Sequence, residues 1–354
     1  MAKEIVIVSA VRTPIGSFMG GLADMPAEAL GSIVISSALS RCKIDPKDVS
    51  EVIMGQVLTA GQGQNPARKA SVNAGIPLTV PAHGVSLVCG SGLKAVISGA
   101  QAIKCGDAEV EILLMETLLF KDTMLIDGLT DIFEGYHMGI TAENIVEKYG
   151  LSREAQDKFA YESQMKAKAA MEANIFESEI VPVTIPPKRK SQTATILDKD
   201  EFRTAGNASG LNDGAAAVVI TSKDYALQHN IPILASIVSY AKVGVEPSIM
   251  GTGPIPAVRA ALEKAGWSKD EVDLYELNEA FASQSLACLH DLQLDPTKVN
   301  VNGGAIALGH PIGASGCRVL VTLVQSMIRR GAKKGVVSLC IGGGMGIAIC
   351  LKAS

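Results

Sequence analysis

Short runs of apolar, often β-branched residues alternate along the chain with longer segments in which apolar side chains recur about every three to four positions. The short runs predict strands and the longer segments predict helices. The predicted strands are residues 4–9, 51–57 and 83–88, and the predicted helices are residues 26–42, 66–73 and 89–105. The strands are apolar almost throughout, which indicates an α/β fold whose sheets are covered by helices on both faces.

The pattern of the first third of the chain returns in the last third. Residues 46–55 and 269–278 each place a charged turn before an apolar strand, and Gly90-Ser91-Gly92-Leu93-Lys94 has a counterpart in Ala314-Ser315-Gly316-Cys317-Arg318. Two such matches in the same order indicate an internal duplication. The duplication would bring Cys89 close to the turn before Ala314, which contains His310.

The segment between the halves differs from both. Residues 121–200 are more charged, with helices predicted at 141–149 and 152–174 and an extended stretch at 180–185, so an inserted domain is expected. The densest basic run of the chain lies at residues 186–190. A solvated loop explains this run, and contact with a phosphorylated cofactor is the alternative.

Composition narrows the classes of function. The 354 residues are 47% hydrophobic and 19% charged, enough for large cores and more than one domain. A net charge of −4 offers no overall basic field for nucleic acid or an anionic membrane, so a small-molecule substrate is expected. No secretory signal or membrane-spanning apolar run stands out, and seven scattered cysteines favour a reducing compartment, so the expected location is cytoplasmic.

Cys89 is the first candidate reactive group. It lies between an apolar run and Gly90-Ser91-Gly92, at the predicted N-terminus of a helix. Unpartnered N–H groups at such a terminus stabilise a thiolate, so the pKa of Cys89 is expected to fall below the usual value of about 8.5. A lone cysteine here is more often structural, so a partner base is needed to support a catalytic role.

His310 and Cys340 are the candidate partners. His310 lies between Gly309 and Pro311 in a constrained loop, where an imidazole can take the proton of a thiol. Cys340 ends an apolar strand predicted at 336–340, before a glycine-rich turn whose N–H groups could face an oxyanion. Each residue alone is equally well explained by a structural role. Paired metal-ligand spacings and nucleotide-binding motifs are lacking, so metal, NAD and nucleotide-hydrolysis chemistry are not expected.

Four motifs taken together resemble those of the thiolase family, in the family's order and over nearly the whole chain. They are Cys89-Gly90-Ser91-Gly92, Asn278-Glu279-Ala280-Phe281, Gly309-His310-Pro311 and Cys340-Ile341-Gly342-Gly343-Gly344. The resemblance implies duplicated α/β halves in a layered αβαβα arrangement with an inserted loop domain. The implied division is an N-terminal half of residues 1–117 plus about 212–232, a shortened CoA-facing insertion of residues 118–211, and a C-terminal half of residues 233–354. A homodimer or homotetramer is implied as well.

The resemblance also implies a two-stage acyl transfer. Cys89, deprotonated with help from His310, takes an acetyl group from acetyl-CoA and releases CoA. Cys340 then removes an α-proton from a second acetyl-CoA, and the carbanion attacks the acetyl group to form acetoacetyl-CoA. His310 and a water held by Asn278 stabilise the enolate, and the N–H groups of Cys89 and Gly342 stabilise the tetrahedral intermediate. CoA thioesters are the substrates, with no tightly bound cofactor and no metal.

The family's binding residues carry over onto five positions. His137, Met138, Met250 and Phe281 line a short acyl pocket, and Ser209 lies against the pantetheine arm of CoA. Apolar side chains there exclude water from the reactive acyl-enzyme. Capping of a helix or a core hydrogen bond would explain His137 equally well.

The chain departs from the family at two places. Family members carry further residues after the strand at 111–114 and between Arg203 and Thr204, where they build part of a CoA-facing loop. Either the protein lacks these residues or the printed sequence omits them; CoA affinity and tetramer assembly depend on which. Two alternatives therefore stay open. One is a ketoacyl-synthase-type condensing enzyme, which has histidine or asparagine where Cys340 stands; the other is a non-catalytic CoA-binding protein on a thiolase scaffold.

Overall fold

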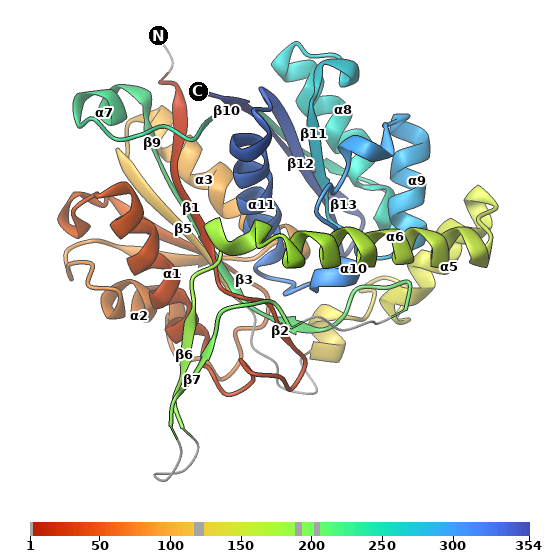
Figure 1. Cartoon of the computed structure of the whole chain (residues 1–354), viewed down its shortest axis with the longest axis horizontal. Coiled ribbons are helices and arrows are strands. Elements are labelled where there is room, and N and C mark those ends of the chain that lie inside the picture. The colour runs from red at the N-terminus through yellow and green to blue at the C-terminus, as the bar shows by residue number, and fades with distance from the viewer. Residues whose placement is uncertain (1–2, 117–123, 188–192, 202–205) are drawn as a thin grey trace.

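The two halves of the chain form the same succession of strands and helices (Figure 1). The computed structural model describes residues 3–116, 124–187, 193–201 and 206–354. The N-terminal half comprises β1 (Ile5–Arg12), α1 (Ala27–Cys42), β3 (Glu51–Gln56), α2 (Pro66–Asn73), β4 (Ala82–Val85), α3 (Ser91–Cys105), β5 (Val110–Glu116) and β9 (Ala215–Ser222). The C-terminal half comprises β10 (Ala235–Gly244), α8 (Pro254–Ala265), β11 (Leu274–Leu277), α9 (Ala282–Leu292), α11 (Ser315–Arg330), β12 (Lys334–Ile341) and β13 (Met345–Ala353).

Strand pairing confirms the predicted duplication. In the first half β3 pairs in parallel with β4 and β5, whereas β9 runs antiparallel to β5 and β1. In the second half β11 is parallel to β12, and β13 runs antiparallel to β12 and β10. A parallel bridge between Tyr275 and Val299 takes the place of β4 there. Antiparallel pairing of β1 with β10 joins the halves into one nine-stranded sheet.

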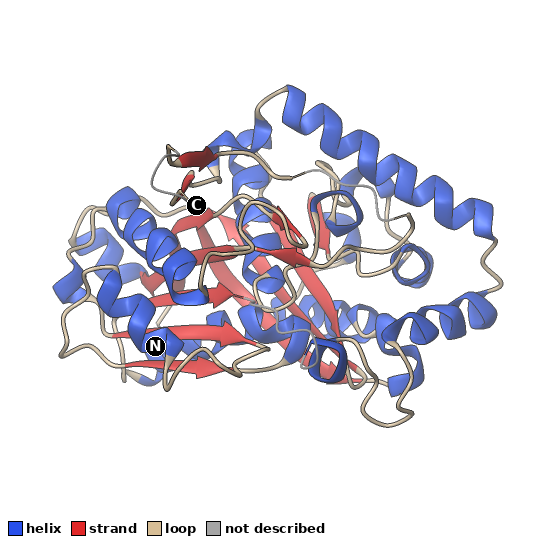
Figure 2. Ribbon diagram, turned by 90° about the horizontal axis from the view of Figure 1, so that it is seen from below, coloured by secondary structure: helices blue, strands red, loops and turns tan. Residues whose placement is uncertain are grey.

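The helices cover both faces of this folded sheet (Figure 2). Apolar side chains of α1 and α2 pack against one face of the first half, and those of α8 and α9 pack against one face of the second. Between the halves α3 and α11 share a single apolar core with strands of both. A Cβ atom at Gly316 would lie 2.6 Å from the backbone nitrogen of Leu93, so these two helices touch closely. This is the predicted αβαβα layering.

The short helices before β3 and β11 also repeat. Each is a 3₁₀ turn, η1 (Pro46–Asp48) in the first half and η6 (Lys269–Glu271) in the second, as the match between residues 46–55 and 269–278 predicts.

One boundary differs from its prediction: β4 ends at Val85, and the 3₁₀ turn η2 (Val88–Gly90) precedes α3. The predicted strand and helix therefore meet in a turn of five residues rather than directly at Cys89.

The segment between the halves contains both predicted helices, as α5 (Met138–Tyr149) and α6 (Arg153–Glu172), with α6 lying across α9 and α10 (Figure 1). The predicted stretch at 180–185 narrows to β6 (Val183–Ile185), which pairs with β7 (Thr195–Leu197). The remaining elements are β2 (Gly16–Ser17), η3 (Met124–Gly128), η4 (Ile175–Ser178), β8 (Asn212–Asp213), α7 (Lys223–Gln228), η5 (Pro247–Thr252), η7 (Pro296–Lys298) and α10 (Ala305–Leu308). Most of the basic run at 186–190 and both predicted loop departures lie outside the described residues.

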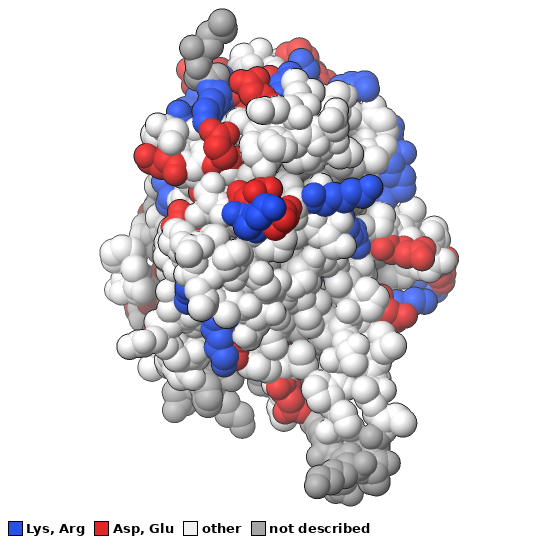
Figure 3. Space-filling view, turned by 90° about the vertical axis from the view of Figure 1, so that its left-hand side faces the viewer, with Lys and Arg blue, Asp and Glu red and all other residues white. Residues whose placement is uncertain are grey.

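Charge is dispersed over the surface that includes α1 and α2. Small groups of acidic and basic side chains alternate there with wide uncharged areas (Figure 3). On this face the described residues form no broad area of a single sign, as expected for a chain with a small net charge. Across the described ranges, no helix has the length and hydropathy needed to cross a membrane.

Candidate active site

A cavity of about 270 Å³ opens where the two halves and the inserted segment meet. Its walls come from η2, the start of α5, η5, the end of β12 and the loops around Ser209, Phe281 and His310. All the predicted site residues except Asn278 line it: Cys89, His137, Met138, Ser209, Met250, Phe281, His310, Cys340 and Gly342. Asn278 is buried and lies against His310. Residues that are far apart in sequence thus converge on one cavity.

Cys89 lies in a tight turn that Ser91 holds together. The Ser91 hydroxyl accepts the N–H of Leu87 at 2.9 Å and donates to the carbonyl oxygen of Val88 at 2.7 Å. Val88 has a φ of 43°, a left-handed conformation that β-branched residues rarely adopt. The hydrogen bonds of this turn and the packing around it maintain the strained conformation of Val88. The turn directs the Cys89 thiol into the cavity.

The electrostatic environment of Cys89 differs from the sequence-based expectation. Burial raises the pKa of the thiol to about 11, although the backbone N–H groups of Gly342 and Cys89 itself stabilise the thiolate. The expected lowering of this pKa is therefore wrong for the unliganded protein. Removal of the thiol from water outweighs the two N–H dipoles, because the surrounding apolar side chains replace solvent without supplying charge.

The loop that carries His310 is fixed by Asn212. The backbone N–H of His310 donates to Oδ1 of Asn212 at 3.0 Å, and Nδ2 of Asn212 donates to the carbonyl oxygen of Gly16 at 3.0 Å. Gly309 has a φ of 107°, and a Cβ atom there would lie 2.3 Å from Cγ of Asn212. Asn212 was not among the predicted site residues. Asn212 lies in a further stretch, residues 207–216, that also resembles the thiolase pattern, and no other feature of the sequence pointed to it.

The hydrogen bonds of Ser315 define the tautomer of His310. The Ser315 hydroxyl lies within hydrogen-bond distance of Nδ1 and donates its single hydrogen to the carbonyl oxygen of Pro311 at 2.9 Å. With the hydroxyl hydrogen directed to Pro311, Nδ1 carries the proton, which leaves the lone pair of the imidazole on Nε2. Nδ2 of Asn278 lies 3.5 Å from this nitrogen. Burial, with the nearby Arg318 charge, lowers the pKa of His310 to about 3, so the ring is neutral.

Cys340 is the second thiol of the cavity. It is 1% exposed at the end of β12 and packs with Met138, Met250, Ala280 and Phe281. Burial raises its pKa well above the usual value, and proximity to Cys89 raises it further. The two sulfurs therefore resist ionising together. A neutral imidazole with a free lone pair and two thiols in one apolar cavity form a set that can pass protons while one sulfur acts as nucleophile.

Two more of the predicted binding residues, His137 and Ser209, make hydrogen bonds at the wall of the cavity. His137 is exposed and caps α5, since its Nδ1 accepts the N–H of Gly139 at 3.0 Å. It therefore makes the predicted capping contact and lines the cavity as well. The N–H and hydroxyl of Ser209 both donate to the carbonyl oxygen of Ala280, each at 3.0 Å. This pairing ties the Ser209 loop to the one that carries Asn278 and Phe281.

Metal ligands do not gather in the part of the chain that the structure describes. No group of three or more His, Cys, Asp or Glu side chains is arranged there to hold an ion. All seven cysteines are free thiols. The reactive set of the cavity thus consists of sulfur, imidazole, amide and backbone groups.

Comparison with known protein families matches most of the chain. The thiolase N-terminal domain matches residues 5–118 and 113–224, and the thiolase C-terminal domain matches residues 231–353. An acetyl-CoA acetyltransferase of Pseudomonas aeruginosa is 52% identical over 389 aligned positions, covering 99% of each chain. The cytosolic acetyl-CoA acetyltransferase of mouse is 50% identical over 392 positions, covering 99% of this chain and 98% of the relative. These alignments are longer than the 354-residue chain, so the relatives contain residues without a counterpart here.

Solved structures agree with this assignment. The acetyl-CoA acetyltransferase of Bacillus anthracis superposes with a TM-score of 0.95 at 38% identity, covering 100% of this chain and 99% of that one. Human mitochondrial 3-ketoacyl-CoA thiolase gives a TM-score of 0.93 at 38% identity, covering 99% of both chains. Sequence identity of 38–52% over nearly the full aligned length shows more than a shared fold. The chain therefore belongs to the thiolase family.

Proposed function

We propose that the protein catalyses the reversible condensation of two molecules of acetyl-CoA to acetoacetyl-CoA and CoA. The observation that carries the proposal is that Cys89, Cys340 and His310 line one cavity, and the lowered pKa of His310 supports a neutral ring that can accept a proton. The names of the relatives, acetyl-CoA acetyltransferases at about half identity over the full chain, support the same reaction.

In the proposed first stage the Cys89 sulfur attacks the thioester carbonyl as its proton passes to Nε2 of His310. Because the pKa of Cys89 is raised to about 11 in the unliganded protein, the thiol loses its proton as the substrate reacts rather than beforehand. The C–S bond to CoA breaks, and the Cys340 proton moves to the departing CoA sulfur. The stage ends with acetyl-Cys89, free CoA, protonated His310 and a Cys340 thiolate.

In the second stage the Cys340 thiolate takes an α-proton from another acetyl-CoA. The proton gained by His310 now makes Nε2 a donor to the enolate oxygen, and a water held by Asn278 supplies a second hydrogen bond. The α-carbon forms a bond to the acetyl carbon, and the Cys89 sulfur leaves and recovers its proton from His310. All protons are then back in place, and the same steps in reverse cleave acetoacetyl-CoA with CoA.

Binding roles follow the same geometry. We propose that His137, Met138, Met250 and Phe281 line the pocket for the acetyl group, and that Ser209 lies against the pantetheine arm. Gly342 supplies an N–H group to the tetrahedral intermediate together with Cys89. Residues 118–211 form the CoA-facing insertion between an N-terminal half, 1–117 plus about 212–232, and a C-terminal half, 233–354. No tightly bound cofactor takes part.

Assembly and location are part of the proposal. A homodimer or homotetramer is supported by β4, which is an edge strand of the nine-stranded sheet and could pair with another strand. A cytoplasmic location is supported by the mouse and rat relatives, which are named cytosolic. Light scattering on the purified protein measures the mass of the assembly directly.

The test of the reaction uses the purified protein under reducing conditions. With acetoacetyl-CoA and CoA it should form acetyl-CoA, and labelled acetyl-CoA should leave its label on Cys89. Cys340→Ser should keep that label and lose condensation. A failure to form acetyl-CoA would refute the proposal.

Two other outcomes distinguish the alternatives. Condensation with malonyl but not acetyl thioesters would indicate a ketoacyl-synthase-type enzyme, which Cys340 argues against. CoA binding without label on Cys89 would indicate a non-catalytic protein.

A further inference from the structure

Arg318 is a buried cation directly behind the proposed reaction site. It lies in α11, is 1% exposed, and its Nη2 donates to Oδ1 of Asn278 at 3.3 Å. Its Nε and Nη1 atoms have no hydrogen-bond partner among the described residues. Burial of a guanidinium with so few partners is costly, so the position of this side chain calls for a physical reason.

The contact with Arg318 determines how the amide of Asn278 is turned. A guanidinium offers only donors, so the carbonyl oxygen of the amide must face it. The amide NH₂ group then faces Nε2 of His310, at 3.5 Å. A flipped amide would place its donors against those of Arg318 and its oxygen against the lone pair of Nε2. The structure therefore allows one orientation of Asn278, and Arg318 selects it.

Arg318 also adds positive charge next to the proposed enolate-binding groups, because it bonds to Asn278 and its charge helps to lower the pKa of His310. Three buried carboxyl groups, those of Glu179, Glu276 and Glu279, interact with Arg318 electrostatically. Burial raises the pKa of Glu276 to about 8, so this carboxyl is largely protonated at neutral pH and does little to neutralise the guanidinium. In a site without solvent, a fixed positive charge stabilises a nearby oxyanion more strongly than it would in water.

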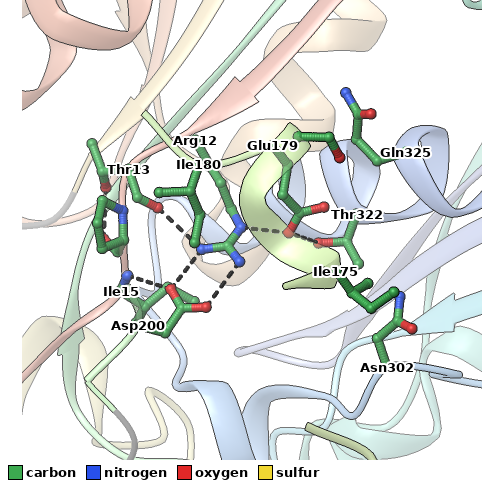
Figure 4. Close-up of polar contacts among 12 residues, drawn as sticks. Arg12, Thr13, Ile15, Ile175, Glu179, Ile180, Asp200, Asn302, Thr322 and Gln325 are labelled. Carbon is green, nitrogen blue, oxygen red and sulfur yellow. Dashed lines mark hydrogen bonds and ion pairs between the residues drawn. The ribbon is translucent and has the colours of Figure 1, made fainter. Parts of the chain in front are cut away.

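A separate network holds the helix that carries Arg318. Arg12 donates to both carboxyl oxygens of Asp200, at 2.6 and 2.9 Å, and to Oε1 of Glu179 at 2.7 Å (Figure 4). The hydroxyl of Thr322 donates to the same Glu179 oxygen at 3.1 Å. Thr322 lies one turn after Arg318 on α11, and in the described part of the chain its hydroxyl bonds to Glu179 and not to Asn278 or His310. It thus offers a control for loss of a buried polar contact on the same helix.

We propose that Arg318 is a positioning residue for the carbon–carbon bond-forming stage, orienting Asn278 and adding positive charge behind the enolate oxygen. The inference rests on the proposed condensation activity and concerns only its second stage. Attack of Cys89 on the first thioester forms no enolate. Loss of Arg318 should therefore slow α-proton removal far more than acetylation of Cys89.

The experiment measures the two stages separately. Rapid quenching after mixing with labelled acetyl-CoA gives the rate of acetyl-Cys89 formation, and deuterium uptake from D₂O into the methyl group of acetyl-CoA reports α-proton removal. In Arg318→Met, deuterium uptake should fall on the order of 100-fold, the cost of one lost oxyanion donor, with acetylation changed less than about threefold. Arg318→Lys keeps the positive charge but lacks the planar guanidinium group. Its rate of deuterium uptake should lie between that of Arg318→Met and that of the unchanged protein.

Thr322→Val is the matched control, and its two rates should fall together by less than about threefold. Thermal unfolding of each variant shows whether the fold is intact. If Arg318→Met does not fold, the ratio of the two rates in Arg318→Lys decides the question. Equal losses in both stages, or unchanged deuterium uptake, would overturn the role of Arg318. Absence of acetyl-Cys89 in the unchanged protein would instead overturn the proposed function.

Discussion

The Ser315 hydroxyl lies within hydrogen-bond distance of both Nδ1 of His310 and the carbonyl oxygen of Pro311. When the hydroxyl hydrogen points to Pro311, the serine oxygen accepts from Nδ1 and the free lone pair of the ring lies on Nε2. Ser315 begins α11, whereas Ser91, its counterpart in the duplication, begins α3 and bonds both sides of the Cys89 turn. The two central helices therefore each begin with a serine whose hydroxyl positions a reactive residue of the cavity, His310 in one case and Cys89 in the other.

Ser315→Ala should release this constraint. Nδ1 would lose its partner, the two neutral tautomers of His310 would both be populated, and the ring would lose its fixed orientation. We expect acetylation of Cys89 and condensation both to slow on the order of ten- to a hundredfold, because His310 serves both stages. Steady-state rates measure the loss, and ¹⁵N chemical shifts of the imidazole measure the tautomer. Ser315→Thr keeps a hydroxyl and should retain most activity; equal losses in both variants would contradict the explanation.

Gly309→Ala should displace the His310 loop. The new methyl group would meet Asn212 at 2.3 Å in a backbone region that disfavours side chains, so both steric overlap and backbone strain oppose it. Gly106→Ala is the matched control, since Gly106 has a φ of 88° but no atom within 4 Å of the new methyl group. The control should lower the free energy of unfolding by about 1 kcal/mol. Its activity should stay unchanged. Gly309→Ala should cost more and lower the condensation rate; similar behaviour of the two variants would contradict this account.

Local patterns predicted an α/β fold with helices on both faces and a duplication that brings Cys89 close to His310, whereas the αβαβα layering and the full set of cavity residues were implied by the resemblance to thiolases. Cys89 and His310 each lie beside glycine or proline in a turn, Cys340 lies near the end of β12 shortly before a glycine-rich turn, and the two halves repeat the same succession. The contributions of Ser315, Asn212 and Arg318 were not predicted. Each acts through a contact with one specific partner, and a serine, asparagine or arginine with such a role has no distinctive pattern along the chain.

The pKa of Cys89 shows a second limit of sequence reasoning. The turn and the N–H groups near the thiol are local, and they correctly suggested stabilisation of a thiolate. Burial is contributed by α5, η5 and the Phe281 loop, which are remote in sequence, and its effect on the pKa is the larger one. The sign of the shift therefore depends on tertiary packing.

The kinetics of alkylation test whether the pKa of Cys89 is raised or lowered. With a pKa of about 11 the thiolate fraction of Cys89 should rise about tenfold for each pH unit between pH 7 and 9. The rate of reaction with iodoacetamide, followed by mass spectrometry of the Cys89 peptide, should therefore rise without reaching a plateau. Cys105 is exposed, and Cys105→Ser removes its background reaction. A plateau below pH 8 would mean that the N–H groups outweigh burial after all.

Glu111 provides a pH-dependent test of the core. It is completely buried in β5, neither carboxyl oxygen has a hydrogen-bond partner among the described residues, and burial raises its pKa from 4.5 to about 8. A carboxyl whose pKa is higher in the folded state favours folding most below pH 4.5, and this contribution is lost as pH rises to about 8.

Glu111→Gln keeps the shape of the neutral carboxyl and cannot ionise. Relative to the unchanged protein, its free energy of unfolding should gain up to about 1.4 kcal/mol for each pH unit across that window and then level off. Urea unfolding at closely spaced pH values measures the difference.

Glu109→Gln is a control in which the pKa shift, and therefore its effect on stability, has the opposite direction. Glu109 lies on the surface near the start of the same strand, and its hydrogen bond with Lys3 lowers its pKa. A lowered pKa stabilises the fold above the unfolded value and loses that effect as pH falls, so Glu109→Gln should be less stable at neutral pH and equal to the unchanged protein in acid. A difference for Glu111→Gln that stays constant with pH would show that Glu111 keeps one protonation state throughout. In that case the stability difference would reflect the packing of the amide rather than the cost of a buried charge.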